Sequence, residues 1–338
     1  MQDSIWEGLK EAWADAIGIV TNPQERAYWL FLVGALVVAG AVLSWRHRSL
    51  ATAARAVFAR ALWWHPSARM DYRLIALNAV VKALLLAPLV LSAFGVAVAV
   101  VGWLTRAFGE PAPSSLSRLQ ITAVYTVVLF VAWDLSRFVV HLLLHRVSAL
   151  WEFHKVHHSA EVLTPLSVYR VHPVESLLFA IRGALVTGVV TGVFFYMFRD
   201  RAIQYELFGV NAIGVLFSMF GANLRHSHVW ISYGRVVERI FISPAQHQLH
   251  HSVDPYDYDC NYGSFLAVWD VLLGSLRLAR RRPRKLGLAD CDKNHDPHGA
   301  VSALVGPVVA LYRRGIAFAR KHALRPHSLE KKHETRAS

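Results

Sequence analysis

Several uninterrupted apolar runs, each about long enough to cross a lipid bilayer, constrain the fold of this 338-residue chain more than any other feature. A membrane-spanning helix needs roughly 20 apolar residues. Runs of about this length or longer occupy positions 28–45, 74–104, 119–144, 176–198 and 204–224. Hydrophobic residues make up 54% of the chain, which is too high for an ordinary soluble enzyme of this size. We therefore predict an all-α integral membrane protein with about four to five transmembrane helices.

The distribution of charge predicts how these helices are oriented. The segment before the first run is mostly acidic, whereas residues 46–73 carry six arginines. The positive-inside rule therefore places the N-terminus outside and residues 46–73 in the cytoplasm. If the run 74–104 crosses the membrane once, residues 145–175 and 225–338 also lie in the cytoplasm. A re-entrant pair within that run would break this parity, and the sequence leaves both readings open.

The net charge of +13 is concentrated beside the apolar runs. We find no nucleic-acid-binding motif, so the expected partners of this charge are anionic lipid headgroups rather than nucleic acid. The two cysteines, Cys260 and Cys291, form no CxxC pair. Any metal site must therefore be built from histidine and oxygen ligands.

Ten of the 18 histidines fall into four compact groups. Residues at positions i, i+3 and i+4 share one face of a helix, so the members of an HxxxH or HxxHH group can point to one site. Neutral imidazole suits iron, zinc and copper, and four groups offer enough nitrogens for two adjacent ions. The candidate ligands are His141, His145, His154, His157, His158, His226, His228, His247, His250 and His251.

Each group has a simpler explanation when it is taken alone. A single HxxxH at the end of a span can be an interfacial pair, and His226 and His228 diverge on a helix because they are two residues apart. The HxxHH pattern, however, occurs twice, which chance does not explain. The combined pattern therefore predicts a metal site.

Three polar residues near these groups are candidates for supporting roles. Asp134 lies seven residues before His141 in an apolar span, where charges usually face the protein interior and pair. It can accept the second N–H of a ligand histidine or form an ion pair with Arg137, and the sequence leaves both open. Glu175 and Asn261 have similar supporting possibilities. Residues 261–270 are interpreted as a turn that packs the polar part of the protein against the membrane.

The order of these motifs resembles the fatty acid hydroxylase / sterol desaturase superfamily, and in particular its bacterial members. The resemblance covers roughly Ala132–Leu276 and is carried by HLLLH, LWEFHKVHHSAEVLTPLSVYRVHPVE, NLRHSH, SPAQHQLHHS and DCNYGSFLAVWDVLLGSL. It implies a helical membrane fold with a cytoplasmic, histidine-rich catalytic cap. It also implies two ferrous ions held by the four groups, with His226 favoured over His228 in the third. His172, within an RxHPxE element, is then a supporting or substrate-facing residue.

The same resemblance implies an O2-dependent di-iron oxygenase that hydroxylates or desaturates a lipid from the bilayer. Hydroxylation is favoured by analogy alone. Electrons are expected from a separate donor of ferredoxin, rubredoxin or cytochrome b5 type. The alternative is a histidine-rich membrane protein that binds or transports metal without oxygenase activity. The Ala- and Arg-rich composition suggests a bacterial inner membrane.

The chain is expected to divide into three regions. Residues 1–118 form an N-terminal membrane region with two spans and a basic cytoplasmic loop. Residues 119–276 form the di-iron catalytic region, and residues 277–338 form a basic polar tail whose end, 324–338, is expected to be disordered. The lipid substrate, the position of attack and the oligomeric state do not follow from the sequence.

Overall fold

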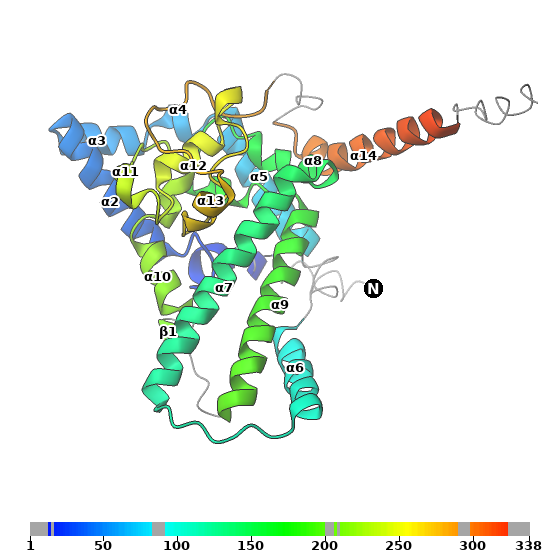
Figure 1. Ribbon diagram of the computed structural model, residues 1–338. Coiled ribbons are helices and arrows are strands. Elements are labelled where there is room, and N and C mark those ends of the chain that lie inside the picture. Colours follow the sequence, from blue (N-terminus) through cyan, green and yellow to red (C-terminus); the bar gives the residue numbers. More distant parts are fainter. Residues whose placement is uncertain are drawn as a thin grey trace, which may run out of the picture.

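The computed structural model describes residues 13–14, 17–82, 92–199, 206–207, 210–289 and 298–323, and most of its regular structure is helical (Figure 1). The longer helices are α2 (Trp29–His47), α5 (Pro66–Val81), α6 (Ala93–Phe108), α7 (Arg118–Arg146), α9 (Pro173–Phe198) and α14 (Ala300–Ala323). The shorter helices are α3 (Leu50–Val57), α4 (Arg60–Trp63), α8 (Ser148–His158), α10 (Ala212–Met219), α11 (Gly234–Val237), α12 (Pro244–His250) and α13 (Val268–Leu273). The other described elements are the 3-10 turns η3 (Pro165–Tyr169), η5 (Ala222–His226) and η6 (Pro255–Asp257), and a hairpin of β1 (Glu206–Leu207) and β2 (Val210–Asn211).

Four helices, α2, α7, α9 and α14, are long and apolar enough to cross a membrane by length and composition. Large apolar side chains are exposed along α7 and α9, including Val124, Val128, Leu185 and Val189. Such a surface is unfavourable in water and suited to lipid. The predicted all-α membrane fold is therefore confirmed, apart from the short hairpin β1–β2, whose strands have two residues each.

Helices α7 and α9 lie side by side and run in opposite directions (Figure 1). The first turn of α7 is closed by a capping box between Ser117 and Gln120. Further along, the Tyr125 ring stacks on Phe194 at 4.8 Å, and its hydroxyl lies 2.7 Å from that of Thr191. These contacts fix α7 on α9, so the last turn of α7 enters the polar end of the molecule at a defined angle.

Helix α6 packs closely against α9 because two glycines of α9 leave room for it. A Cβ at Gly188 would lie 2.6 Å from the carbonyl oxygen of Ala93, and one at Gly192 would lie 2.8 Å from that of Ala97. Small residues at such crossings let membrane helices approach backbone to backbone. The α6–α9 pair is therefore a helix contact that only glycine permits.

The apolar run 74–104 is divided between α5 and α6. Helix α5 lies at the end of the molecule that contains α8 and α12, whereas α6 lies beside the opposite half of α9 (Figure 1). Residues 83–91 are outside the described residues. Helices α5 and α6 thus follow one another from the first end toward the second. This agrees with the reading in which the run 74–104 crosses the membrane once.

The prediction that 204–224 forms a spanning helix is wrong for the described residues of this run. The hairpin β1–β2 is followed by α10, whose eight residues are too short to cross a bilayer. The Asn211 side chain caps α10 by accepting a hydrogen bond from the backbone N–H of Ile213. Gly221, with φ of 123°, then separates α10 from the turn η5. Hydropathy does not reveal these breaks, because only two residues, Asn211 and Gly221, interrupt a segment in which many residues are apolar.

The C-terminal region contains α14. The sequence analysis predicted only a basic polar tail in this region and no helix. Its Ala300 and Ala303 pack against Met70 of α5 and Val156 of α8. The helix projects across the direction of α7 and α9 (Figure 1), and the large apolar side chains exposed along it are Val301, Val305, Val308 and Tyr312. Residues 324–338, expected to be disordered, are outside the described residues.

The shorter elements gather at one end of α7 and α9. This end contains α3, α4, α8, α11, α12 and α13, together with the chain segments that connect them (Figure 1). We call this end the cap. All four histidine groups lie in the cap or at the helix ends that enter it.

Candidate metal centre

Four elements bring the histidines together. His141 and His145 lie one turn apart at the end of α7, and the second group lies on the last turns of α8. His226 ends the turn η5, and the fourth group occupies α12 and its C-cap. Helix α12 starts sharply because Pro244 stands at its first turn and Ser243 forms a capping box with Gln246. Each group is therefore held on a short, well-defined helical turn.

Nine of the ten candidate histidines converge in two adjacent sets. The first set, site A, consists of His141, His145, His154, His158 and His250. The second set, site B, consists of His157, His226, His247 and His251. Within each set, one ring nitrogen of every member lies within 4.8 Å of those of all the others. Rings from the two sets also contact each other, with the centroids of His158 and His251 4.5 Å apart.

The Nε2 atoms point toward common centres. In site B, Nε2 of His226 lies 3.1 Å from that of His157 and 3.0 Å from that of His247. In site A, Nε2 of His141 lies 3.1 Å from that of His250. Two nitrogens at right angles on one ion, each bonded at roughly 2.1 Å, lie about 3.0 Å apart. The observed spacings therefore match ligands that share a metal.

Backbone carbonyls fix the protonation of several rings. Nδ1 of His141 lies 2.7 Å from the carbonyl oxygen of Tyr262, and Nδ1 of His250 lies 2.7 Å from that of Cys260. Nδ1 of His157 faces the carbonyl of Arg170 at 3.3 Å. Because a carbonyl only accepts, Nδ1 of each ring carries the proton and Nε2 presents its lone pair.

Burial keeps these rings neutral. It lowers the pKa of His154, His157 and His250 to about 3, because the charged imidazolium loses its hydration inside the protein. Neutral imidazole is the form that binds metal. It follows that Nε2 of His141 and Nε2 of His250, both lone pairs, face each other at 3.1 Å. That contact is repulsive unless a cation lies between them, so the residues of both sites fit metal ions.

Asp134 has neither of the roles proposed from the sequence. Its carboxylate accepts hydrogen bonds from the backbone N–H groups of Phe265 and Leu266 and from Nε1 of Trp269, at 2.9–3.1 Å. The predicted bond to His141 is wrong, because Nδ1 of that ring bonds to a carbonyl. Arg137 lies over the rings of neighbouring aromatic residues. Asp134 instead fixes the loop that provides the carbonyl for His141.

Glu175 lies where a supporting carboxylate was expected. Its Oε2 is 3.1 Å from Nδ1 of His154, and both side chains are buried. A carboxylate at this position orients a ligand ring and increases its basicity. Asn261 does not contact a histidine ring through these bonds but supports the helix that contains the fourth group. Its side-chain amide N–H donates to the carbonyl of Gln246, and its amide oxygen accepts from the backbone N–H of Arg277. These two bonds hold α12 in place.

Two predicted histidines lie away from the sites. His172 caps α9 by accepting from the N–H of Val174, and its Nε2 bonds to the carbonyl of Leu304 on α14. His228 belongs to neither set and is half-buried. Its ring forms a hydrogen bond to the backbone of Ala56 instead. We therefore remove His228 from the candidate ligands and regard His172 as a residue that stabilises the fold.

The loop after α12 supports the site in a way that the sequence reading missed. Gly263 was expected only to permit a turn, yet its φ is not positive, and a Cβ there would lie 2.5 Å from the carbonyl oxygen of Leu266. The buried Asp270 accepts from the N–H groups of both Tyr262 and Gly263. The motif NYGS…WD contained these residues, but nothing in its spacing shows that its carbonyls contact imidazoles.

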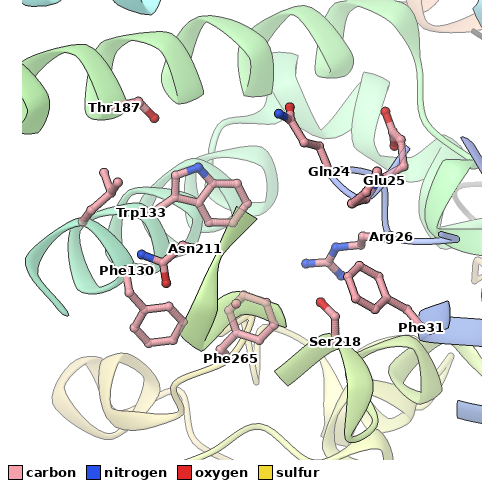
Figure 2. Close-up of a pocket in the computed structure, with 13 residues that line it drawn as sticks. Gln24, Glu25, Arg26, Phe31, Phe130, Trp133, Thr187, Asn211, Ser218 and Phe265 are labelled. Atoms are coloured by element: carbon pink, nitrogen blue, oxygen red, sulfur yellow. The ribbon is translucent and has the colours of Figure 1, made fainter. Parts of the chain in front are cut away.

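Two cavities lie near the centre. One, of about 280 Å³, lies among α7, α9, α10 and the segment before α2, and Figure 2 shows Trp133, Phe130 and Phe265 on one side and Arg26 on another. We call it the membrane-side cavity. The second, of about 220 Å³, touches His145, His158 and His250 from the cap. The histidines of site A thus adjoin the second cavity, while the membrane-side cavity is lined by both apolar and polar side chains.

Comparison with known families supports this geometry. Residues 126–275 match the fatty acid hydroxylase family. This segment, 150 of the 338 residues, resembles the fatty acid hydroxylase domain. The resemblance read from the motifs is therefore confirmed, and the domain contains all nine converging histidines.

The fatty acid hydroxylase domain is similar to several curated enzymes. It is 28% identical over 145 residues to an ornithine lipid hydroxylase from Rhizobium tropici, covering 42% of this chain and 38% of that protein. It is 27% identical over 146 residues to an alkylglycerol monooxygenase from Danio rerio, covering 43% and 29%. A delta(7)-sterol 5(6)-desaturase from Gibberella zeae is 31% identical over 183 residues, covering 51% and 50%. The matched segments thus span half or less of each relative's length, and no solved structure matches the chain significantly.

Proposed function

We propose that this protein is a membrane-bound, O2-dependent di-iron oxygenase that hydroxylates or desaturates a lipid C–H bond. The observation that carries the proposal is the convergence of nine imidazoles in two adjacent sets, eight of them buried and that of His145 half-buried. The relatives named above are a lipid hydroxylase, a monooxygenase and a desaturase. A redox metal is needed for such chemistry, because no amino-acid side chain attacks an unactivated C–H bond.

The two histidine sets divide the proposed iron ligands. Site A would hold one ion with five imidazoles and site B the other with four. Ferrous iron bound there would supply the activation of O2 and the oxidation of the substrate. Three carbonyls, those of Tyr262, Cys260 and Arg170, would keep the Nε2 lone pairs directed at the ions.

The cavities indicate how reactants reach the centre. The membrane-side cavity is bordered by Leu129, Phe130 and Trp133 of α7 and by Thr187 of α9, so an apolar chain can enter it from the bilayer. The smaller cavity in the cap offers a separate, more polar approach to His145 and its neighbours. We propose that electrons arrive from this side, from a separate donor.

The alternative of a metal transporter is less well supported. A transport path would place ligands along the spanning helices, whereas the nine histidines gather at one end of α7 (Figure 1). The Nδ1 atoms of His141 and His250 are also bonded to carbonyls, which favours fixed ligands over exchanging ones. We propose a bacterial inner-membrane location, with the cap in the cytoplasm and the basic segments near anionic headgroups.

Isotope incorporation tests the proposed activity. Cells that express the protein would be grown under isotopically labelled O2, and their lipids analysed by mass spectrometry against cells expressing His250→Ala. Hydroxylation predicts a lipid that gains one labelled oxygen only with the wild-type protein, and desaturation predicts a lipid that loses two hydrogens. Identical lipid profiles in the two strains, with both proteins present in the membrane, would argue against oxygenase activity.

A further inference from the structure

The membrane-side cavity has an amphiphilic lining. Aromatic residues of α7 form one wall, while the segment before α2 contributes polar side chains to another. Figure 2 shows the Arg26 guanidinium pointing into the cavity, with Ser218 nearby and Asn211 on the far side. A wholly apolar substrate would need no such charge. The cavity is therefore shaped for a ligand that has both an apolar and a polar part.

The Arg26 guanidinium is only partly satisfied by the described residues. Its Nη2 is buried and forms no hydrogen bond with any of them. Burial lowers the pKa of this group well below its ordinary value, because the charged form loses its hydration. Arginine side chains nevertheless remain protonated in proteins. A charge in apolar surroundings is unfavourable unless it is paired and hydrogen-bonded.

Two carboxylates near Arg26, its sequence neighbour Glu25 and its electrostatic neighbour Asp134, are already engaged. Asp134 accepts three hydrogen bonds from the loop that contains Phe265. Glu25 accepts a hydrogen bond from the hydroxyl of Tyr169. Neither carboxylate forms an ion pair with Arg26 within the described part of the chain. The compensating negative charge must therefore come from another group.

A second buried arginine adds to the positive potential. Arg225 is 3% exposed, and its Nη2 also lacks a hydrogen-bond partner among the described residues. The guanidinium carbons of Arg26 and Arg225 lie 5.8 and 5.1 Å from the centre of the same ring, that of Phe265. Arg225 lines a further apolar cavity of about 390 Å³, to which Phe265 also contributes. The Phe265 ring thus adjoins two cavities and two cations.

We propose that the membrane-side cavity binds the anionic end of a lipid substrate, its carboxylate or phosphate oxygens, through Arg26, with Arg225 reinforcing the attraction. Guanidinium matches both groups because its N–H donors can bind two oxygens at once. This inference rests on the proposed function, since it names the substrate class of the same centre.

The site lies close to the metal ligands. Arg225 immediately precedes His226, and Phe265 follows Tyr262, whose carbonyl holds His141, by three residues. The charged end of the lipid is thus held near site B, which limits the carbons that can be presented to the centre.

A comparison of three ligands with the same chain tests the inference. Hexadecanoic acid, hexadecyl phosphate and hexadecanol would be titrated by calorimetry into the full-length protein in nanodiscs of neutral lipid, at a pH above 8 so that the carboxylate is ionised. The acid or the phosphate is expected to bind about ten-fold or more tightly than the alcohol. The stronger of the two identifies the source of the anion.

Variants distinguish the role of Arg26 from a general effect of charge. Arg26→Gln should remove the preference for the anion and leave hexadecanol binding unchanged, while Arg26→Lys should keep part of the preference. Arg235→Gln, an exposed arginine in the cap, is the matched control and should behave as wild type. Equal affinity for alcohol and anions in the wild-type protein, or an undiminished preference in Arg26→Gln, would overturn the inference.

Iron content measured on the same samples separates this inference from the proposed function. An anion preference in protein that binds no iron would support the cavity assignment and count against the oxygenase. Iron-loaded protein that consumes O2 but shows no anion preference would support the oxygenase and count against the cavity assignment. The thermal unfolding temperature of Arg26→Gln and Arg26→Lys shows whether either variant fails to fold. If one does, the anion preference of the other variant decides whether Arg26 binds the anion.

Discussion

At the scale of single residues, the centre depends on which nitrogen of each imidazole carries the proton. The carbonyls of Tyr262 and Cys260 each accept from an Nδ1 atom, which leaves the Nε2 lone pairs of His141 and His250 facing each other. A hydrogen bond between those two atoms would need a second proton on a deeply buried ring. Burial opposes that proton, so the arrangement is suited to a metal rather than to a hydrogen-bonded histidine network.

Glu175 provides a test of how the ligands are oriented. Its carboxylate lies 3.1 Å from Nδ1 of His154. Replacing it by glutamine removes the charge but keeps the size, and should weaken metal binding by about 10- to 100-fold. Metal retention against a graded series of chelator concentrations measures the effect.

The control for this prediction is Glu110→Gln. Glu110 is exposed and pairs with Arg199 far from the cap (Figure 1). It should retain metal like the wild type. If Glu175→Gln and Glu110→Gln resist the chelator equally, Glu175 has no part in orienting His154.

The histidines also predict how stability depends on pH. His154, His157 and His250 have pKa values of about 3 in the folded protein, against 6.5 in an unfolded chain. Between these values the unfolded state binds more protons, so the free energy of unfolding of the metal-free protein falls as the pH drops below about 6.5. The thermal unfolding temperature of chelator-treated protein should decrease steadily from pH ~7 to ~4.5. A flat profile over that range would show that these rings are not buried as described.

Much of the candidate site could be predicted at this scale. The i, i+3 and i+4 spacings identified eight of the nine converging histidines, because a ligand group on one helical turn leaves a mark in the sequence. The ninth, His226, was favoured by the family resemblance. The supporting contacts were harder. The partners of Asp134 and His141 are separated from them by more than 100 residues, and two of the key acceptors are backbone carbonyls, which every residue has.

At the scale of helices, hydropathy showed where α2, α7 and α9 lie but not how they pack. The close contact of α6 with α9 depends on two glycines that an apolar run does not distinguish from other small residues. The run 204–224 failed as a span because Asn211 and Gly221 interrupt it. Helix α14 was missed because arginines and alanines alternate with its larger apolar residues, so that no continuous apolar run appears. Its apolar face becomes visible only when the residues are arranged with a helical period.

Glycine substitutions test the α6–α9 contact. In Gly188→Val the new side chain would meet Val96 and the carbonyl of Ala93 at 2.5–2.6 Å. Such overpacking typically destabilises a protein by about 1–3 kcal/mol. We expect a lower unfolding temperature in detergent and a lower yield of folded protein.

Gly183→Ala is the matched control for this substitution. Gly183 lies on the same helix, but a Cβ there meets nothing within 4 Å. Alanine at this position should leave the unfolding temperature unchanged or raise it slightly. Equal behaviour of the two variants would mean that α6 does not pack on α9 at Gly188.

At the scale of the whole molecule, polar and apolar parts are separated along one axis. The cap gathers segments that are distant in the sequence, whereas α6, α7 and α9 extend away from it (Figure 1). Charge bias predicted that the segments around 46–73 and 145–175 would lie on one side, and they lie at the same end of the molecule. The two histidine sets therefore lie where the helices that are able to span a membrane meet the cap.

The proposed orientation can be tested from both sides of the membrane. A fluorescent protein fused after Ser338 should fluoresce, because the positive-inside rule puts the cap in the cytoplasm. A cysteine at Ser115, in the segment between α6 and α7 at the opposite end, should react with a membrane-impermeant thiol reagent in intact spheroplasts (Figure 1). Labelling only after the membrane is broken, with a dark fusion, would reverse the orientation.

The metal content of the purified protein tests the central claim most directly. Protein expressed with iron and purified in detergent should contain about two iron ions per chain, one for each histidine set. His250→Ala in site A and His247→Ala in site B should each lose at least one ion, while His228→Ala should keep both. Two ions in all four proteins, or no iron in the wild type even after anaerobic reloading with ferrous iron, would contradict the di-iron assignment.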